Sequence, residues 1–451
     1  MPAGARPRPP SLRLSGPYRH GGPHAAAHGA APPARQASLR RHNLALVLRE
    51  VAAGGPLSRA ELSRRTGLTK ASVSTMVDSL TSCGVLEELS SEGSPRPGPG
   101  RPGSPVGFGP TSPVAIGLEV AVGYTSACVV DLAGRCSRQS LLVLDNRALG
   151  PAAGMQRAAR LVAELARSVR DQGRRLLGCG LAVPGVVGPS GELWWVPNMA
   201  TWAGLHPAQV LDDLLQEHMG GAVLTGPGGL VADAGTPGDG LRALAVGNEA
   251  NLGALAELWY GGHRHLEDFL RVSGEVGVGA GIVSGGRLLT GARGAAGELG
   301  HVNVEPEGLP CACGARGCLE QYAGQEAIVR QAGAPGYGQV LDMAARGEPS
   351  ALLALEEAGR ALGLAVAATL NVVDVPTIVL GGIYAELAPY IQAALARQLA
   401  ERVVGGRFGP VRVVAAGVGR EAAMRGAGGV VAHQVVADPA AHLPELLDRS
   451  A

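Results

Sequence analysis

The sequence feature that most constrains the fold is a cluster of one histidine and three cysteines in the C-terminal half of the chain. His301 is followed by Cys311, Cys313 and Cys318, and two glycines, Gly314 and Gly317, lie between the last two cysteines. One imidazole and three thiolates complete a tetrahedral zinc shell without an open position, so this spacing predicts a structural zinc site. Unligated cysteines in a loop are the alternative. Seven Cys is an odd count, and four of them are scattered, so a metal site in a reduced compartment fits better than a disulfide framework.

The charge of the chain is divided unequally along its length. The net charge is only +1, but residues 1–112 carry 14 basic and six acidic side chains and therefore a charge of +8. We call residues 1–112 the head and the remainder the body. A basic head on an acidic body predicts that only the head binds a polyanion. The apolar content of 46% excludes a wholly disordered chain. No apolar run reaches the length of a membrane-spanning helix, and we expect a cytoplasmic protein that does not contact a membrane.

Changes in composition divide the chain into segments. Strand-like and helical runs alternate from Val114 onward, and two successive α/β units predict a two-lobed body with a cleft between the lobes. The expected segments are a disordered Arg/Pro-rich tail (1–38), a winged helix-turn-helix domain (39–89), a Pro/Gly linker or wing (90–112), the α/β body (113–435) and a C-terminal tail (436–451).

The basic head carries the pattern of a helix-turn-helix. Ser58 and Glu61 have the spacing of a capping box and predict a short helix over 59–65. Gly67 then allows a tight turn, and Thr69 caps a second helix. This second helix presents apolar residues at the spacing of one buried face, namely Val73, Met76, Val77 and Leu80.

The exposed face of the second helix carries short hydrogen-bonding side chains and one cation, which suits a recognition helix in a major groove. The candidate DNA-binding residues are Thr69, Lys70, Ser72, Ser74 and Thr75. Residues 85–89 are expected to begin a wing. Arg101 in the linker is a candidate for minor-groove insertion, with a plain linker as the alternative. The alternative for the whole head is a small helical bundle that contacts proteins.

The body carries a resemblance to a known family. The segment GARGAAGELGHVNVEPEGLPCACGARGCLEQYAG resembles the signature of the ROK family of repressors, open reading frames and sugar kinases. AVPGVV, PNMATW, GNEANLGALAE, GVGAGIVSGGRLL and PTIVLGGIYAE occur in family order over 113–433. The resemblance implies an actin-like, hexokinase-type domain of two lobes with a sugar in the cleft. Together with the head, the chain resembles the ROK regulators of sugar metabolism, which include the xylose and N-acetylglucosamine repressors.

The resemblance also implies a set of sugar-binding residues. Amides and carboxylates supply the paired donors and acceptors that vicinal hydroxyls require. A turn role for the two asparagines, and a solvated position for Glu320, are the alternatives. If His301 binds zinc through one ring nitrogen, the other nitrogen remains for a hydroxyl, and the metal orders the loop. The implied residues are Asn198, Asn248, Glu249, Glu298, His301 and Glu320.

The sequence departs from the family kinases where they bind ATP and activate the sugar. Glu249 stands where the kinases carry the catalytic aspartate, and its extra methylene displaces the carboxylate. The first phosphate turn reads EVAVGYT (119–125), which lacks the Gly-Gly-Thr of the kinases. The second turn carries Glu275 where backbone N–H groups cradle phosphates in the kinases, and this introduces repulsion. The sequence therefore predicts a protein without phosphoryl-transfer activity.

These observations predict a sugar-responsive DNA-binding regulator, acting as a repressor. Its expected partners are double-stranded operator DNA, a monosaccharide effector and a second copy of the chain in a homodimer or a dimer of dimers. Two alternatives remain. One is an ATP-dependent sugar kinase of the ROK family, and the other is a DNA-binding scaffold whose sugar pocket is inactive.

Overall fold

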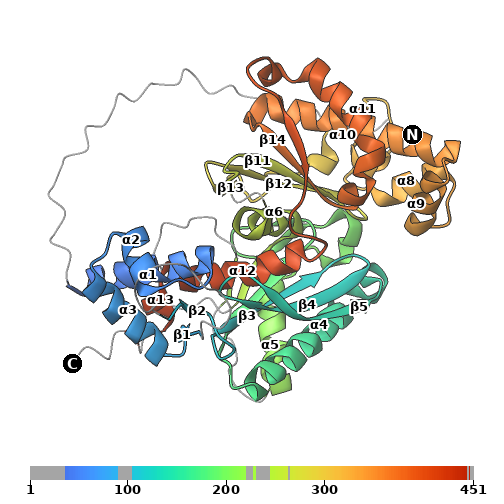
Figure 1. The fold of residues 1–451 in the computed structure, drawn as a ribbon. Helices are drawn as coiled ribbons and strands as arrows, with labels where there is room; N and C mark the ends of the chain where they lie inside the picture. The colour runs from blue at the N-terminus through green and yellow to red at the C-terminus, as the bar shows by residue number, and fades with distance from the viewer. Residues whose placement is uncertain are drawn as a thin grey trace, which may run out of the picture.

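The computed structural model describes residues 36–89, 104–219, 227–229, 244–262, 265–443 and 446. These residues form a small helical head and a two-lobed body, with the head beside one lobe (Figure 1). The predicted tail lies outside the described residues up to position 35, but its last residues already belong to the first helix. Arg101 also lies outside the described residues. Among the helices that are described, none is long and apolar enough to cross a membrane.

The head contains three helices and a short two-stranded wing. Ser58 accepts a hydrogen bond from the Glu61 amide, and Gly67 ends the helix that follows at a φ of 72°. One strand of the wing falls in the segment that the sequence assigned to a linker or wing, so the end of that segment is part of the wing. The elements are α1 (Gln36–Gly54), α2 (Arg59–Thr66), α3 (Lys70–Ser82), β1 (Glu87–Glu88) and β2 (Val106–Gly107).

The N-terminal lobe is built on a six-stranded sheet with the order β5-β4-β3-β6-β10-β9. Strands β3, β4 and β5 form an antiparallel meander, while β6 and β10 run parallel to β3. Apolar side chains of α4 and the sheet form the core of this lobe. The elements are β3 (Val114–Val120), β4 (Tyr124–Asp131), β5 (Cys136–Val143), α4 (Asn146–Asp171), β6 (Leu176–Val183), β7 (Val186–Val187), β8 (Leu193–Trp195), η1 (Pro197–Trp202), α5 (Pro207–Met219), β9 (Pro227–Gly229) and β10 (Leu244–Asn248).

The C-terminal lobe repeats this plan on a five-stranded sheet with the order β13-β12-β11-β14-β15. An antiparallel β11–β12–β13 meander again continues into parallel strands. The predicted two-lobed α/β architecture is therefore confirmed. The elements are β11 (Phe269–Gly274), β12 (Val278–Ser284), β13 (Arg287–Leu289), η2 (Leu299–His301), α7 (Glu320–Ala323), α8 (Gln325–Ala332), α9 (Tyr337–Ala345), α10 (Pro349–Val373), β14 (Thr377–Gly382), α11 (Ile383–Arg402), η3 (Val404–Arg407) and β15 (Arg412–Ala415).

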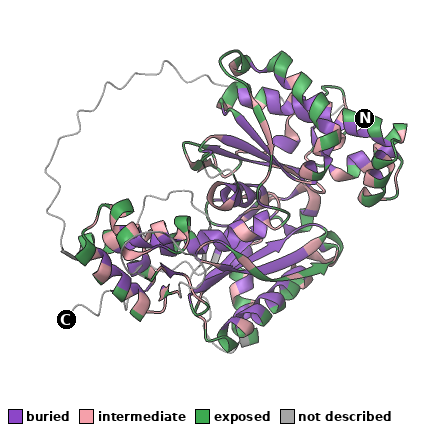
Figure 2. Ribbon diagram, viewed as in Figure 1, coloured by how far each residue is buried: buried purple, intermediate pink, exposed green. Residues whose placement is uncertain are grey.

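Two further helices, α6 (Glu249–Tyr260) and α12 (Ala422–Ala437), lie between the lobes and pack against each other (Figure 1). Glycines bring α12 close to the N-terminal sheet and to α6. A Cβ at Gly117 would lie 1.9 Å from the Met424 carbonyl oxygen, and one at Gly426 would lie 2.0 Å from the Leu252 carbonyl oxygen. This close contact holds α12 to the sheet along its length, and its inward face is buried (Figure 2).

Residues 436–443 and Leu446, the described part of the segment predicted as a C-terminal tail (436–451), pack against the head and do not form a tail. α12 extends to Ala437, α13 (Pro439–His442) follows it, and both helices contact α1 of the head. Leu443 and Leu446 are buried in one apolar cluster with residues of α1 and α3. Arg41 of α1 also pairs with Asp438, at 2.6 Å between Nη2 and Oδ2. The head and body therefore share a core.

Candidate functional site

The six predicted sugar-binding residues line one cavity between the lobes. Asn198, Asn248 and Glu249 reach it from η1, the end of β10 and the start of α6 on the side of the N-terminal lobe. Glu298, His301 and Glu320 reach it from around η2 and α7 of the C-terminal lobe. Each lobe therefore contributes half of the polar groups.

Asn248 is held by its own hydrogen bonds. Its Oδ1 accepts from the backbone N–H groups of Ala250 at 2.9 Å and Asn251 at 3.1 Å and so caps α6. Its Nδ2 donates to the Gly185 carbonyl at 3.0 Å and to Glu249 Oε2 at 3.3 Å. The side chain thus fixes the start of α6 and orients Glu249 in the cavity. This is the turn-type role that the sequence left open for this residue.

The carboxylates of the cavity are withdrawn from water. Glu320 is 8% exposed, and its Oε2 accepts hydrogen bonds from Val278 N at 3.3 Å and Asn198 Nδ2 at 3.4 Å, so it is not a solvated charge. Burial, followed by the charge of Glu320, raises the pKa of Glu298 to about 7. Burial also raises the pKa of Glu249 well above its ordinary value. Burial thus favours the protonated form, and a protonated carboxyl group can both donate and accept hydrogen bonds, as a polyol requires.

The histidine and the three cysteines meet beside the cavity. Their ligand atoms all lie within 4.8 Å of one another, with 3.7 Å from His301 Nδ1 to Cys311 Sγ and 3.6 Å between the sulfurs of Cys313 and Cys318. A tetrahedral zinc with Zn–S and Zn–N bonds of about 2.3 and 2.0 Å separates its ligand atoms by about 3.5–3.8 Å. The cluster therefore fits a metal ion. Because Nδ1 faces the sulfurs, Nε2 is left for the cavity.

A group that the sequence did not reveal closes the cleft at the two phosphate turns. The Tyr124 hydroxyl lies 2.9 Å from Glu119 Oε1 and 3.0 Å from Glu275 Oε1, so it connects the two lobes. Burial and the charge of Glu275 raise the pKa of Glu119 to about 8. Glu119 and Glu275 were recognisable in the sequence as departures from the kinase pattern. The contact between them through Tyr124 was not, because it depends on the β3–β4 turn that directs the Tyr124 hydroxyl toward both carboxyl groups.

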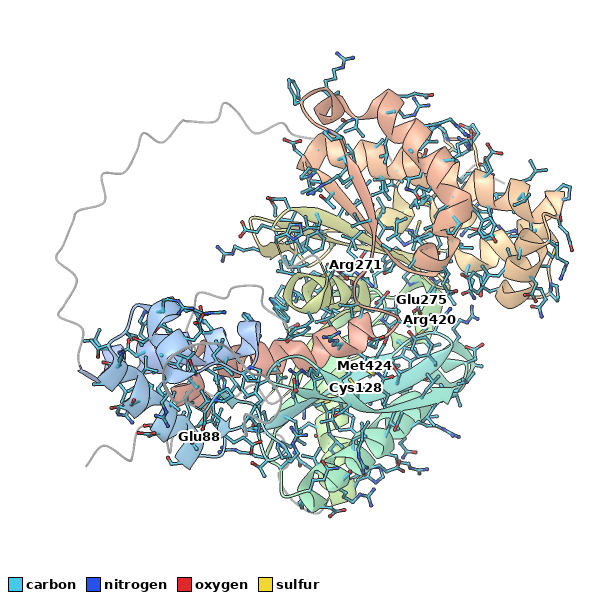
Figure 3. The ribbon with its side chains drawn as sticks, viewed as in Figure 1. Glu88, Cys128, Arg271, Glu275, Arg420 and Met424 are labelled. Atoms are coloured by element: carbon cyan, nitrogen blue, oxygen red, sulfur yellow. The ribbon has the colours of Figure 1, made fainter. Side chains whose placement is uncertain are left out.

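Two arginines lie in the same cleft (Figure 3). Arg271 is 3% exposed and its Nε has no hydrogen-bond partner, and burial lowers its pKa. Arg420 pairs with Glu386 at 2.6 Å. No sequence pattern marks Arg271 as a cavity residue, because it is the one charged residue of the mostly apolar strand β11.

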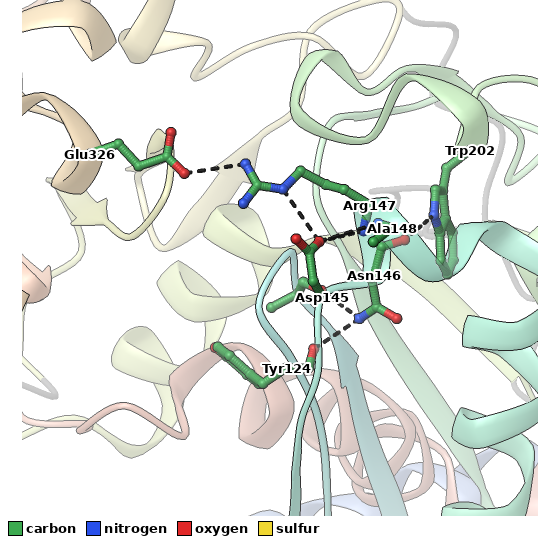
Figure 4. Close-up of polar contacts among 8 residues, drawn as sticks. Tyr124, Asp145, Asn146, Arg147, Ala148, Trp202 and Glu326 are labelled. Atoms are coloured by element: carbon green, nitrogen blue, oxygen red, sulfur yellow. Dashed lines mark hydrogen bonds and ion pairs between the residues drawn. The ribbon is translucent and has the colours of Figure 1, made fainter. Parts of the chain in front are cut away.

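The turn that carries Tyr124 is held by the first turn of α4 (Figure 4). Asn146 Nδ2 donates to the Tyr124 carbonyl at 3.1 Å, and the Asn146 carbonyl accepts from Trp202 Nε1 at 3.2 Å. The neighbouring Arg147 reaches Glu326 of the C-terminal lobe at 3.2 Å. A second polar contact therefore connects the lobes near the tyrosine bridge.

The predicted DNA-binding residues lie on the N-terminal part of α3. Thr69 caps the helix by accepting from the Ser72 amide at 3.2 Å. Lys70 and Thr75 are exposed, whereas Ser72 and Ser74 are half-buried. The five residues that the sequence singled out on this face are Thr69, Lys70, Ser72, Ser74 and Thr75.

The chain matches family models in both parts. Residues 242–434 match the ROK family, and residues 45–96 match the MarR family. The chain is 26% identical to the xylose repressor of Bacillus spizizenii over 82% of this chain and 89% of that protein. It is 33% identical to the kanosamine kinase of Amycolatopsis mediterranei over 60% of this chain and 81% of that protein.

A solved structure has the same fold over nearly the whole chain. It is described as a ROK family transcriptional regulator and a homologue of the Escherichia coli Mlc protein. The match covers 91% of this chain and 99% of that structure, with 22% identity and a TM-score of 0.67. The arrangement of a helix-turn-helix head on an actin-like body is therefore shared with a solved protein.

Proposed function

The chain belongs to the ROK family, and on that basis we propose that it is a sugar-responsive DNA-binding transcriptional regulator that acts as a repressor. In this proposal the α2–α3 unit binds operator DNA, and a monosaccharide in the interlobe cavity changes the operator affinity. The xylose repressor, similar over most of both chains, supports this function. We propose a cytoplasmic location, as expected for a protein that binds operator DNA.

The observation that carries the proposal is the path from the cavity to the head. The start of α12, with Ala422 and Ala423, lines the cavity, and Arg420 lies just before it. The other end of α12, with Val431 and Val435, belongs to the buried cluster of the head. A helix of 16 residues thus has one end at the ligand site and the other at the DNA-binding unit.

This path suggests how the switch operates. A sugar that contacts both lobes stabilises the form in which the lobes are closed, because the two halves of the polar ring then reach it together. Glu249 at the start of α6 moves with its ligand, and α6 packs along α12. We propose that closure is transmitted through α12 to α1, and that in a homodimer it changes the spacing of two heads on their half-sites.

We propose a structural zinc ion at His301, Cys311, Cys313 and Cys318. The ion would fix the orientation of the His301 ring by binding one of its nitrogens. Trp195 also restrains that ring, by packing edge-on at 4.8 Å between centroids. It would hold the loop that carries Glu298 and Glu320 at a constant position. The sugar hydroxyls are assigned to Asn198, Glu249, Glu298, His301 and Glu320, with Asn248 orienting Glu249.

A sugar kinase is the second candidate, favoured by the 33% identity to the kanosamine kinase. Against it, Glu119, Tyr124 and Glu275 fill the place where the family kinases hold ATP phosphates. Both carboxyl groups would repel a triphosphate when ionised, and the tyrosine blocks close approach of the backbone. We therefore propose that the chain does not transfer phosphate.

The test is a titration of the full-length, zinc-loaded protein with DNA selected by it from a random-sequence library. Operator affinity and melting temperature are measured with a panel of neutral monosaccharides, their phosphates and ATP with Mg²⁺. We expect one sugar to change both the operator affinity and the melting temperature, and we expect neither change in Glu298→Ala. Glu217→Ala, on the exposed face of α5, is the matched control. Sugar-dependent ADP formation, or an operator affinity unaffected by every sugar that binds, would contradict the proposal.

A further inference from the structure

Two cysteines outside the zinc cluster lie unusually close together in the N-terminal lobe. The sulfurs of Cys128 on β4 and Cys136 on β5 are 2.8 Å apart. Free sulfur atoms normally stay about 3.5–4 Å apart, as other heavy atoms in packed interiors do, and those of Cys313 and Cys318 lie 3.6 Å apart. The pair is therefore closer than packing alone explains.

The local backbone brings these sulfurs together. The pairing of β4 with β5 shifts register between Ala127↔Ser140 and Val129↔Ser137, so two residues of β5, Arg138 and Gln139, lie opposite the single residue Cys128. This β-bulge is therefore on β5, where Arg138 has a φ of 46°. A bulge bends its strand and increases the local twist, which here brings Cys136 of β5 close to Cys128. Arg425 of α12 holds the turn that connects the two strands, through a hydrogen bond of 2.5 Å from Nε to the Gly134 carbonyl.

The two thiols differ in access. Cys128 is 0% exposed, while Cys136 is half-buried beside exposed residues of the edge strand. The hydrogen bond to Cys136, together with burial, raises the pKa of the Cys128 thiol, so Cys128 is not the sulfur that reacts first. Cys136 is placed to meet a small oxidant, and Cys128, with its sulfur 2.8 Å away, is placed to reach the Cys136 sulfur once that sulfur is oxidised.

We propose that Cys128 and Cys136 form a reversible disulfide when the protein meets a peroxide. The Cys136 sulfur attacks one oxygen of hydrogen peroxide, the O–O bond breaks as the S–O bond forms, and the other hydroxyl leaves with the Cys136 proton as water. The Cys128 sulfur then attacks the sulfenic sulfur, an S–S bond forms, and the hydroxyl leaves with the Cys128 proton as a second water. Two thiols lose two electrons in all, and one peroxide is reduced to two waters.

The site lies under the first turns of α12. Cys128 forms a small apolar cluster with Val130 and Met424, and Cys136 packs against that cluster. Figure 3 shows Cys128 beside Met424, close to where Arg420 enters the cleft. The redox site is therefore separate from the zinc cluster, which belongs to the other lobe.

The experiment uses the full-length, zinc-loaded protein, treated with hydrogen peroxide and then with an alkylating reagent. Trypsin cleaves after Arg135, between the two cysteines, so a disulfide appears as two cross-linked peptides, lighter by two hydrogen atoms than the free pair. We expect this cross-linked species in the wild type, its loss on treatment with dithiothreitol, and its absence in Cys136→Ser.

Two controls keep the result specific. Cys179→Ser removes another fully buried thiol of the same lobe and should leave the cross-link intact. Zinc release, followed with a chromogenic chelator, separates oxidation of the zinc cluster from oxidation of the pair. Recovery of both Cys128 and Cys136 in alkylated form, or of Cys136 only as a sulfinic acid, from peroxide-treated wild type would overturn the proposal.

Discussion

Truncating Leu443 tests whether the C-terminal segment holds the DNA-binding head to the body. Leu443 is 1% exposed within the cluster that contains Leu44 and Leu48 of α1. Replacing a buried leucine by alanine costs about 3 kcal/mol when the site relaxes only in part. Because each 1.4 kcal/mol is a factor of ten, Leu443→Ala should raise the population of undocked heads by about 150-fold.

Limited trypsin digestion reports this population directly. Arg49 of α1 donates to the Ala437 carbonyl at 3.4 Å, and Arg41 pairs with Asp438, so these two exposed arginines hold α1 to the C-terminal segment while the head is docked. Cleavage after either arginine then requires local unfolding of α1. When reclosing is faster than cleavage, the cleavage rate follows the open population. We therefore expect cleavage within α1 to accelerate by about two orders of magnitude in Leu443→Ala. The sugar response of operator binding should weaken as well.

The matched control is Leu353→Ala, since Leu353 lies on α10 with 65% exposure. It removes the same atoms without opening a buried cluster, and its cleavage rate should equal that of the wild type. Equal cleavage of the two variants would show that residues 438–446 do not hold the head. The proposed route through α12 would then have to be abandoned.

Three further predictions address the site and the head. Because burial raises the pKa of Glu298 from 4.5 to about 7, its ionisation disfavours the folded state as the pH rises through that interval. The melting temperature of Glu298→Gln should therefore be close to that of the wild type at pH 5 and higher than that of the wild type at pH 8. The same difference in melting temperature at pH 5 and pH 8 would show that ionisation of Glu298 is not responsible. Removal of zinc by a chelator should abolish the sugar-dependent melting shift, which a titration of the metal-free protein measures. Lys70→Ala should weaken DNA binding for all sequences. It should also reduce, by about one, the slope of the logarithm of the binding constant against the logarithm of the salt concentration.

The sequence alone was sufficient to predict the structure wherever a local pattern of residues determines it. The caps at Ser58 and Thr69 follow from spacing that a single segment contains. The cluster of His301 and the three cysteines also follows, since its four residues lie within 18 positions of sequence. The assembly of the cavity residues in one place came from the family pattern, not from local periodicity.

Contacts between distant segments were beyond the sequence. Leu443 and Leu446 stand in a short segment with no apolar period, and they are buried only because α1, some 400 residues away, packs on them. Tyr124 is one residue of a turn until β12 brings Glu275 to it. The approach of Cys128 to Cys136 needs a bulge that no strand pattern reveals.

The division of the cavity between the lobes restricts which molecules can act as effectors. A ligand shifts an equilibrium between open and closed lobes only by its difference in affinity for the two forms. A fragment that contacts only Glu298 and Glu320 makes the same contacts whether the lobes are open or closed, because both residues belong to the C-terminal lobe. Such a fragment should raise the melting temperature without changing operator affinity. In the proposed site a whole monosaccharide would also reach Asn198 and Glu249 of the other lobe, so only the whole ring would gain contacts on closure. A polyol fragment that switches DNA binding as fully as the complete ring would refute closure as the source of the response.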